Sequence, residues 1–324
     1  MADGTHPVAA VLRERRLAGS RPGARRDPHR VALVLEGGGM RGVVSAGMTA
    51  ALERLALTPC FDLVVGASAG AINGAAFLAG SAQQGAAAYC GPLASRSFVS
   101  PMKVVRRKPV MDVKQILDLA AGLDAAGHEQ VIASGVELRC VAVEVETART
   151  TTLTGMRTQD ELWNALLASS RMPWAGGAPV EIGGSRYLDG GMAAPIPVRQ
   201  ALDAGATHVL ALQTRPFGVP RRSAFRAADW FIERHLRRLN PALVDMYRRR
   251  VTEYEVLVED IGRRSAHPGE EPPHVLGIRP AAGTPCVGQL ERRAPVLSTA
   301  AADAERLVET ALSTGSWLRA APAA

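Results

Sequence analysis

Apolar and polar residues follow two periods along this chain, one typical of buried strands and one typical of helices. Short, continuous apolar runs occur at 31–36 (VALVLE), 61–66 (FDLVVG) and 207–214 (THVLALQT), as in strands buried within a parallel sheet. Helical spacing follows the first two runs, at 44–56 and 67–80. Strand and helix therefore alternate, which predicts an α/β fold with three layers, helices covering both faces of a mainly parallel central sheet.

The middle of the chain continues this alternation. Residues 112–123 have helical spacing, and a second helix is expected after Thr158, because Glu161 three positions later completes a capping box. Residues 136–153 alternate polar and apolar positions, as a hairpin or one long strand would. A short helix is expected over 197–205, which begins with proline and ends with glycine.

The two ends of the chain differ from this core, which we assign to residues 30–214. Residues 1–29 mix Arg, Pro, Gly and Ala without periodicity, so we expect a flexible basic arm. Residues 215–324 are expected to be mainly helical and packed on the core. They contain an apolar stripe for which core packing is favoured over a membrane-facing role. The stripe consists of Phe225, Ala228, Ile232, Leu236 and Leu239.

The composition fits a globular protein and argues against several other classes. Hydrophobic residues make up 47% of the chain, enough for a core, yet no run of eighteen apolar residues occurs. The N-terminus lacks the apolar segment of a signal peptide. The four cysteines are far apart without CxxC spacing, which argues against a zinc site and against a disulfide framework. We therefore expect a cytoplasmic protein with reduced cysteines and no metal.

The charge of the chain is positive and unevenly distributed. Lys and Arg total 38 against 31 acidic residues, and the excess lies in 1–30, 103–108 and 221–250. Such patches can meet nucleic acid or an anionic membrane surface. With 4% aromatic residues and no recognition-helix pattern, no nucleic-acid partner is expected. A solvated basic face and peripheral contact with the inner membrane surface are the two interpretations that stay open.

Three adjacent glycines, Gly37, Gly38 and Gly39, follow the first strand and open a helix. Unpaired N–H groups and the positive end of a helix dipole suit an anion at such a place. Gly37, Gly39 and Gly42 also satisfy the GxGxxG pattern of dinucleotide-binding loops. That interpretation requires an acidic residue at the end of the next strand, which is missing. A purely structural tight turn is the third alternative.

A second motif, GxSxG, is formed by Gly66, Ser68 and Gly70 between a strand and a helix. In this context a strained turn raises the serine hydroxyl above the sheet, and its neighbours must be small because strand and helix pass closely. A serine becomes a good nucleophile only when a base removes its proton. Support for a histidine as that base is weak, although His267 and His274 fall in a proline-rich loop where a triad histidine could lie.

A third motif is formed by Asp189, Gly190 and Gly191 at the end of another strand. Asp-Gly-Gly is common as a simple turn. Because ligands of parallel sheets bind beyond the carboxyl ends of the strands, Asp189 and Ser68 are both expected on that side. There a carboxylate can act as the general base.

In this order, EGGGMRG, GASAG and DGG resemble the three motifs of the patatin-like phospholipase family, whose members use a Ser-Asp dyad without histidine. The resemblance covers about residues 30–214. It implies that Ser68 is the nucleophile and Asp189 the base, with no cofactor. It also implies an oxyanion hole at Gly37, Gly38 and Gly39 with Arg41 beside it. The remaining motif glycines are Gly42, Gly66, Gly70, Gly190 and Gly191.

The resemblance further implies a serine ester hydrolase that acts on acyl lipids, including phospholipids, through an acyl-Ser68 intermediate. Burial should raise the pKa of Asp189 from its usual value of about 3.9 toward the working pH. A transacylase or a thioesterase would use the same dyad, and a catalytically silent lipid-binding protein could keep the fold. The motifs specify neither the lipid, its head group and chain length, nor the oligomeric state.

Overall fold

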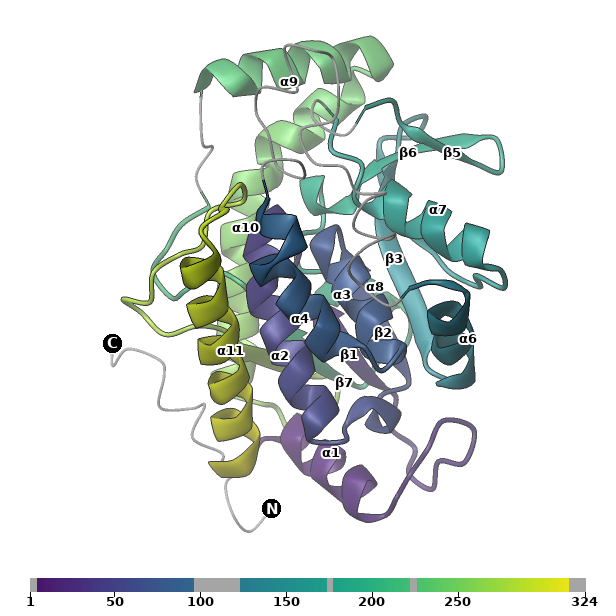
Figure 1. The fold of residues 1–324 in the computed structure, drawn as a ribbon, viewed down its shortest axis with the longest axis vertical. Helices are drawn as coiled ribbons and strands as arrows, with labels where there is room; N and C mark the ends of the chain where they lie inside the picture. Colours follow the sequence, from purple (N-terminus) through teal and green to yellow (C-terminus); the bar gives the residue numbers. More distant parts are fainter. Residues whose placement is uncertain (1–4, 96–122, 174–176, 222–225, 315–324) are drawn as a thin grey trace.

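An eight-stranded sheet forms the centre of the computed structural model, which describes residues 5–95, 123–173, 177–221 and 226–314 (Figure 1). The strand order is β5-β6-β3-β2-β1-β7-β8, with β4 paired to β3. Strands β3, β2, β1, β7 and β8 are parallel, whereas β4, β5 and β6 run antiparallel to their neighbours. The strands are β1 Val31–Leu35, β2 Leu63–Ala67, β3 Glu137–Glu144, β4 Arg149–Leu153, β5 Val180–Ile182, β6 Ser185–Asp189, β7 His208–Leu212 and β8 His274–Ile278.

The side chains of the central strands alternate between the two faces of the sheet. Leu33 and Leu35 of β1 belong to one apolar cluster, and Ala32 and Val34 to another. The first face is covered by α2 (Val43–Arg54), α3 (Ala69–Leu78), α4 (Ala82–Cys90) and α11 (Ala294–Thr314). The second face is covered by α8 (Val198–Asp203) and α10 (Ala242–Ala266). The predicted three-layer α/β fold is confirmed.

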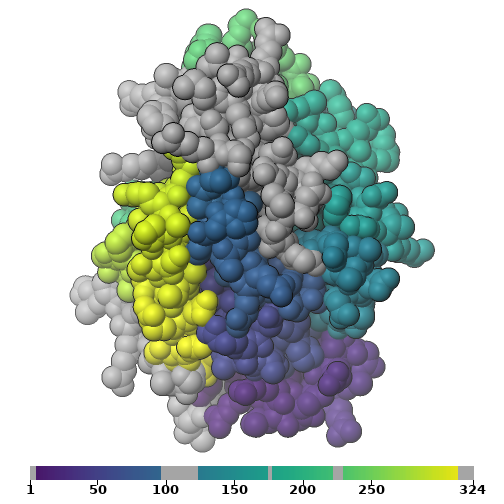
Figure 2. Space-filling view, viewed as in Figure 1, coloured from purple at the N-terminus to yellow at the C-terminus, as the bar shows by residue number. Residues whose placement is uncertain are grey.

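Helices α2, α4 and α11 lie side by side on the first face (Figures 1 and 2). Helix α2 crosses α11 at Gly47, where a Cβ atom would overlap the carbonyl group of Ala301. The absence of a side chain at Gly47 therefore lets the two helices pack backbone to backbone.

Several predicted elements are confirmed in the middle of the chain. The polar alternation over 136–153 is the hairpin of β3 and β4. Helix α7 (Gln159–Ser169) begins after Thr158, and Thr158 and Glu161 form the expected capping box. Helix α6 (Ala125–Ala133) precedes the hairpin. Residues 112–122 of the helix expected over 112–123 lie outside the described residues.

The C-terminal region contributes to the sheet as well as covering it. Strand β8 was not predicted, because its short apolar run follows a proline-rich loop; it pairs in parallel with β7, and His274 opens it. The helical stretch is divided into α9 (Arg226–Leu239) and α10, separated by Asn240 and Pro241. Ile232 and Leu236 are buried in an apolar cluster, so core packing is confirmed for these two members of the stripe, whereas Phe225 lies outside the described residues.

The N-terminal segment is not the flexible arm that we expected. Helix α1 spans Pro7–Leu17, begins after the capping residue His6, and buries Val8 and Leu12 in the main apolar cluster. Periodicity was hard to recognise because the buried face of this helix also contains Arg15, which is 2% exposed. Because of the buried Arg15, the sequence pattern did not reveal this helix, which lies at the amino ends of the strands, at the bottom of Figure 1.

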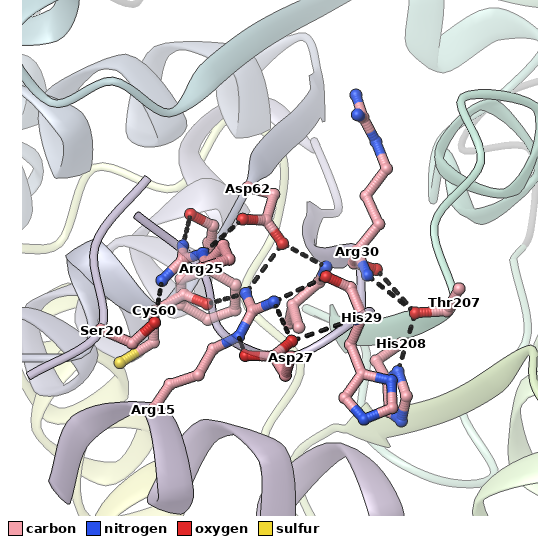
Figure 3. Close-up of polar contacts among 12 residues, drawn as sticks. Arg15, Ser20, Arg25, Asp27, His29, Arg30, Cys60, Asp62, Thr207 and His208 are labelled. Carbon is pink, nitrogen blue, oxygen red and sulfur yellow. Dashed lines mark hydrogen bonds and ion pairs between the residues drawn. The ribbon is translucent and has the colours of Figure 1, made fainter. Parts of the chain in front are cut away.

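Arg15 is buried because it is surrounded by acceptors (Figure 3). Its guanidinium group donates to both carboxylate oxygens of Asp27, at 2.7 and 3.0 Å, and to Asp62 at 2.8 Å. Arg25 donates to the other oxygen of Asp62 at 2.7 Å. The carbonyl oxygens of Cys60 and His29 also accept from Arg15. These arginines are therefore neutralised inside the fold and do not form part of a basic surface.

Candidate active site

Ser68 occupies the sharp turn between β2 and α3. Its backbone has φ 56° and ψ −130°, a conformation that is costly for a residue with a side chain. The turn is held from below, since the N–H of Ser68 donates to the carbonyl oxygen of Ser169 at 3.1 Å and to its hydroxyl at 3.0 Å. The GxSxG motif thus forms the strained strand-to-helix elbow that the sequence predicted.

The motif glycines lie where neighbouring atoms leave no room for a side chain. A Cβ atom at Gly66 would overlap the first turn of α3, and one at Gly70 would overlap the carbonyl of β1. At Gly190 it would overlap the carbonyl of Val141 in β3, and at Gly42 it would come within 2.7 Å of α3. Close packing at these points fixes the elbow and the aspartate turn relative to each other.

Asp189 ends β6 and lies directly beside the elbow. The hydroxyl of Ser68 donates to Oδ2 of Asp189 at 2.8 Å, although 121 residues separate them in the sequence. The other oxygen, Oδ1, accepts the N–H of Gly191 at 2.7 Å, which fixes the orientation of the carboxylate. The structure therefore brings the predicted nucleophile and the predicted base into hydrogen-bond contact.

The environment of Asp189 makes it a stronger base than an ordinary aspartate. The side chain is buried, with 5% exposure, and this desolvation raises its pKa from 3.8 to about 6. Hydrogen bonds from Ser68 and Gly191 and the positive charge of Arg221 oppose the shift. At neutral pH the carboxylate is ionised, but its pKa is close enough to neutral for it to accept a proton readily.

The glycine loop lies against the same elbow. A Cβ atom at Gly37 would lie 2.9 Å from Cβ of Ser68, so only glycine allows the loop to approach. The N–H of Gly37 donates to the carbonyl oxygen of Pro195 at 3.3 Å and is not free to bind a ligand. Among the described residues, no acceptor occupies the N–H groups of Gly38 and Gly39. Of the three expected oxyanion donors, two are therefore available.

Arg41 supports the loop from behind. Its side chain is 5% exposed, and Nε donates to the hydroxyl of Thr214 at 3.0 Å. The guanidinium group occupies the place where a side chain of Gly38 would lie. Glu36, 3.9 Å from Arg41, accepts the N–H of Thr214 at 2.5 Å and the hydroxyl of Tyr254 at 3.1 Å. This buried network holds the loop in place.

Two residues of the site come from outside the three motifs. Arg221 donates to the carbonyl oxygen of Gly191 at 3.0 Å, and Tyr254 of α10 binds Glu36. The sequence indicated Arg221 only as part of a basic stretch, and nothing distinguished Tyr254 from a core residue. Glu36, which directly follows β1, was the available signal, because a buried carboxylate requires partners.

The histidines lie elsewhere. His208 and His274 open β7 and β8, at the amino edge of the sheet, and His29 stacks edge-on against His208 with ring centroids 4.5 Å apart. None of the seven histidines, all in the described part of the chain, hydrogen-bonds to Ser68 or Asp189. The alternative of a serine-histidine-acid triad is therefore not supported.

No group of three or more His, Cys, Asp or Glu side chains in the described part of the chain could hold a metal ion. No described helix is both long enough and apolar enough to cross a bilayer.

Comparison with known proteins identifies the family. A sequence model of the patatin-like phospholipase family matches residues 33–202, just over half of the chain. The chain belongs to this family. All three motifs of this patatin-like protein lie within the matched segment, and the family places it in general terms among lipid acyl hydrolases.

Two known proteins are similar to this chain. Uncharacterized protein YjjU of Escherichia coli (strain K12) is 30% identical to this patatin-like chain over 261 residues, covering 78% of this chain and 68% of YjjU. The crystal structure of VipD from Legionella pneumophila aligns with a TM-score of 0.41 and 12% identity, covering 88% of this chain and 67% of VipD. That structural similarity is too low to inform function.

Proposed function

We propose that this patatin-like protein is a serine acyl hydrolase that cleaves ester bonds of lipids, including phospholipids, through an acyl-Ser68 intermediate. The observation that carries the proposal is the 2.8 Å hydrogen bond from the Ser68 hydroxyl to the buried carboxylate of Asp189. A positioned base next to a serine on a strained elbow is the arrangement that nucleophilic catalysis requires.

The reaction takes place in two steps. Asp189 accepts the proton of Ser68 as the serine oxygen attacks the ester carbonyl carbon, and the alcohol leaves with that proton. A water molecule then attacks the acyl-serine and gives a proton to Asp189, which passes it to the departing serine oxygen, so that the fatty acid, the free serine and the ionised Asp189 are released. The N–H groups of Gly38 and Gly39 stabilise the oxyanion in both steps, and loss of one such donor costs about 3 kcal/mol of transition-state stabilisation.

The position of α3 assists the same chemistry. Ser68 precedes the first residue of this helix, so the positive end of the helix dipole faces the developing charge on the serine oxygen. Together with the raised pKa of Asp189, this brings the pKa of the Ser68 hydroxyl and the pKa of Asp189 closer together. An aspartate can thus activate the serine without a histidine.

The proposal is tested by labelling and hydrolysis. Wild type should react with a fluorophosphonate probe and cleave p-nitrophenyl esters, whereas Ser68→Ala should do neither. The matched control is Ser298→Ala, an exposed serine on α11, which should behave as wild type. Equal labelling of wild type and Ser68→Ala would refute the nucleophile, and no labelling of either would favour a silent lipid-binding protein.

A transacylase or a thioesterase would share the first half-reaction. Offering glycerol as a second acyl acceptor, or acyl-CoA as the donor, separates these activities from hydrolysis. Predominant transfer to glycerol would indicate a transacylase, and faster turnover of acyl-CoA than of oxygen esters would indicate a thioesterase.

We also propose peripheral contact with an anionic membrane surface, through the outer face of α9. Trp230 and Phe231 are 58% and 64% exposed, and their rings meet edge-on with centroids 4.8 Å apart. Arg234 lies 5.9 Å from the Trp230 ring centroid, and Arg237 and Arg238 are exposed beside it. At about 100° per residue these five side chains share roughly one third of the helix circumference. Aromatic rings among arginines suit the interface of an anionic bilayer.

The acidic residues of α9 lie on its other side. Asp229 pairs with Arg250 at 2.9 Å and Glu233 with Arg248 at 2.7 Å, both on α10. The charges of the helix are therefore segregated, with the acids bound to the protein and the arginines on the free face. Figure 1 places α9 at the end of the molecule opposite α1.

A further inference from the structure

Arg221 lies near Ser68 and Asp189 but takes no part in the proposed reaction steps. Its Nη2 donates to the carbonyl oxygen of Gly191 at 3.0 Å, and the N–H of Gly191 holds Asp189. A side chain at Gly191 would begin 3.8 Å from Cβ of Ser68. One residue therefore separates the guanidinium group of Arg221 from both members of the dyad.

A second arginine shares the same aromatic platform. The guanidinium carbon of Arg221 lies 5.4 Å from the ring centroid of Tyr254, and that of Arg215 lies 5.8 Å from it. Tyr254 is 2% exposed, and its hydroxyl is bound to Glu36. The ring is thus fixed, and both arginines are held against a rigid surface.

The charges at this place are not balanced. Glu36 and Asp189 are the buried carboxylates there; the oxygens of Glu36 are occupied by Thr214 and Tyr254, and Asp189 is bound by Ser68 and Gly191. The carboxylate of Glu255 accepts the backbone N–H of Arg221 at 2.7 Å. Within the described ranges, neither Arg215 nor Arg221 forms an ion pair with a carboxylate, and Nε of Arg215 is buried without an acceptor. Partly buried cations that form no ion pair are unfavourable. Such an arrangement favours an anion from outside the chain.

The electrostatics of Arg221 agree with this imbalance. Desolvation and the nearby charge of Arg215 lower the pKa of Arg221 to about 10, so it stays protonated at neutral pH but repels its neighbour. An anion bound by both guanidinium groups would relieve that repulsion.

We propose that Arg215 and Arg221 bind the phosphate group of the lipid substrate, which makes this enzyme selective for phosphate-bearing lipid esters over neutral ones. Guanidinium groups match phosphate oxygens in charge and in geometry. In a glycerophospholipid only a few bonds separate the phosphate from the scissile carbonyl, which fits a phosphate site next to the dyad. This inference rests on the proposed hydrolase function, but its test does not require turnover.

The test measures binding to Ser68→Ala protein by titration calorimetry. The probes are dibutyryl phosphatidic acid, the neutral dibutyrylglycerol, and inorganic phosphate, all below any micelle-forming concentration. We expect the phosphatidic acid to bind at least tenfold more tightly than either of the others. Arg215→Gln combined with Arg221→Gln should abolish most of this preference and leave the binding of dibutyrylglycerol unchanged.

Control variants separate this role from structural damage. Arg16→Gln removes an exposed arginine of α1 and should leave the preference intact. Arg215→Lys should retain part of it. If Arg221→Gln unfolds the protein, Arg215→Gln alone decides, because no hydrogen bond of the Arg215 side chain is found within the described part of the chain.

Three results would overturn the proposal: no preference for phosphatidic acid, a preference that survives in the double variant, or inorganic phosphate binding as tightly as the lipid. The last would indicate a site for the free anion. Failure of the hydrolase function would appear separately, as absence of fluorophosphonate labelling in wild type. In that case calorimetry would still decide whether the phosphate site exists.

Discussion

The two ends of the central sheet contain arginines in opposite situations. At the amino end, Arg15 and Arg25 are enclosed by Asp27, Asp62 and backbone carbonyls. At the carboxyl end, Arg215 and Arg221 lie against an aromatic ring, and among the described residues neither guanidinium group forms an ion pair with a carboxylate. The same type of side chain therefore has a structural role at one end and is available for a ligand at the other.

This difference gives a physical criterion for function in a basic protein. The net charge of +7 says nothing about where positive charge is accessible. Arginines that are paired with carboxylates contribute to stability, whereas buried arginines near a nucleophile that form no ion pair cost stability and are retained for another reason. Substitutions at the two ends should thus affect different measurements.

The largest contrast is expected from the same substitution at each end. Asp189→Asn should lower kcat by about a thousandfold, since the base is lost. Asp62→Asn should leave kcat within about twofold but destabilise the protein, because Asp62 binds two arginines and the N–H of Val31. Ester hydrolysis and thermal melts of both variants test this, and full activity of Asp189→Asn would show that the base is another group.

Asp189→Asn should also make the protein more stable at high pH. Because the folded-state pKa of about 6 exceeds the usual 3.8, this carboxyl group stabilises the folded state below pH 4, and that contribution is lost as pH rises through 6. Two pKa units correspond to about 3 kcal/mol, reduced to about 2 by the lost hydrogen bond. Melting temperatures at pH 8 and pH 4 should show a gain only at pH 8.

Removal of an arginine should give the next largest difference between the two ends of the sheet. Arg15→Gln leaves Asp27 and Asp62 without their buried partner and should cost about 3 kcal/mol in the free energy of unfolding. Arg221→Gln should cost less than about 1 kcal/mol, since a repulsive contact with Arg215 disappears as well. Urea denaturation gives both values, and equal losses would remove the distinction between the two clusters.

Vesicle binding should distinguish the exposed apolar residues of the two ends. Replacing Trp230 and Phe231 by serine should weaken binding to phosphatidylglycerol vesicles by about tenfold, because less apolar area enters the bilayer. Leu17→Ser, at a leucine of α1 that is 77% exposed, should have no effect. Co-sedimentation in low and high salt measures this, and binding to neutral phosphatidylcholine of equal strength would argue against an electrostatic contribution.

The smallest effect concerns the pH profile. Because Asp189 must be ionised to accept a proton, kcat/KM for a neutral ester should fall below about pH 6. Arg221 lowers the pKa of Asp189, so Arg221→Gln should move this acid limb upward by less than about one pH unit. Arg16→Gln should leave it in place. A limb that moves downward would show that Arg221 acts on Asp189 in another way.

The sequence was sufficient to predict those parts of the structure that a short motif or a continuous apolar run determines. The elbow around Ser68 and the aspartate turn are short, and their glycines are required by contacts within a few residues of each motif or with an adjacent strand. The parallel sheet followed from uninterrupted apolar runs, and the matched family segment confirms the resemblance. The roles of Ser68 and Asp189 themselves remain predictions.

The sequence was insufficient where an element depends on distant partners. Helix α1 carries Arg15 on its buried face, and that arginine is compatible with a core only because Asp62 lies 47 residues further on. Strand β8 is too short to be recognised without β7 beside it. Arg221 and Tyr254 belong to the site through contacts that no motif spacing encodes.

The pairing of β8 with β7 limits how far this protein can be shortened toward its motif-bearing part. A chain shortened to residues 30–214 would leave β7 as an open edge with unpaired backbone groups, and open edges invite aggregation. It would also lose Tyr254, and with it one of the partners of Glu36 behind the glycine loop. The smallest unit that folds is therefore larger than the smallest unit that can be recognised.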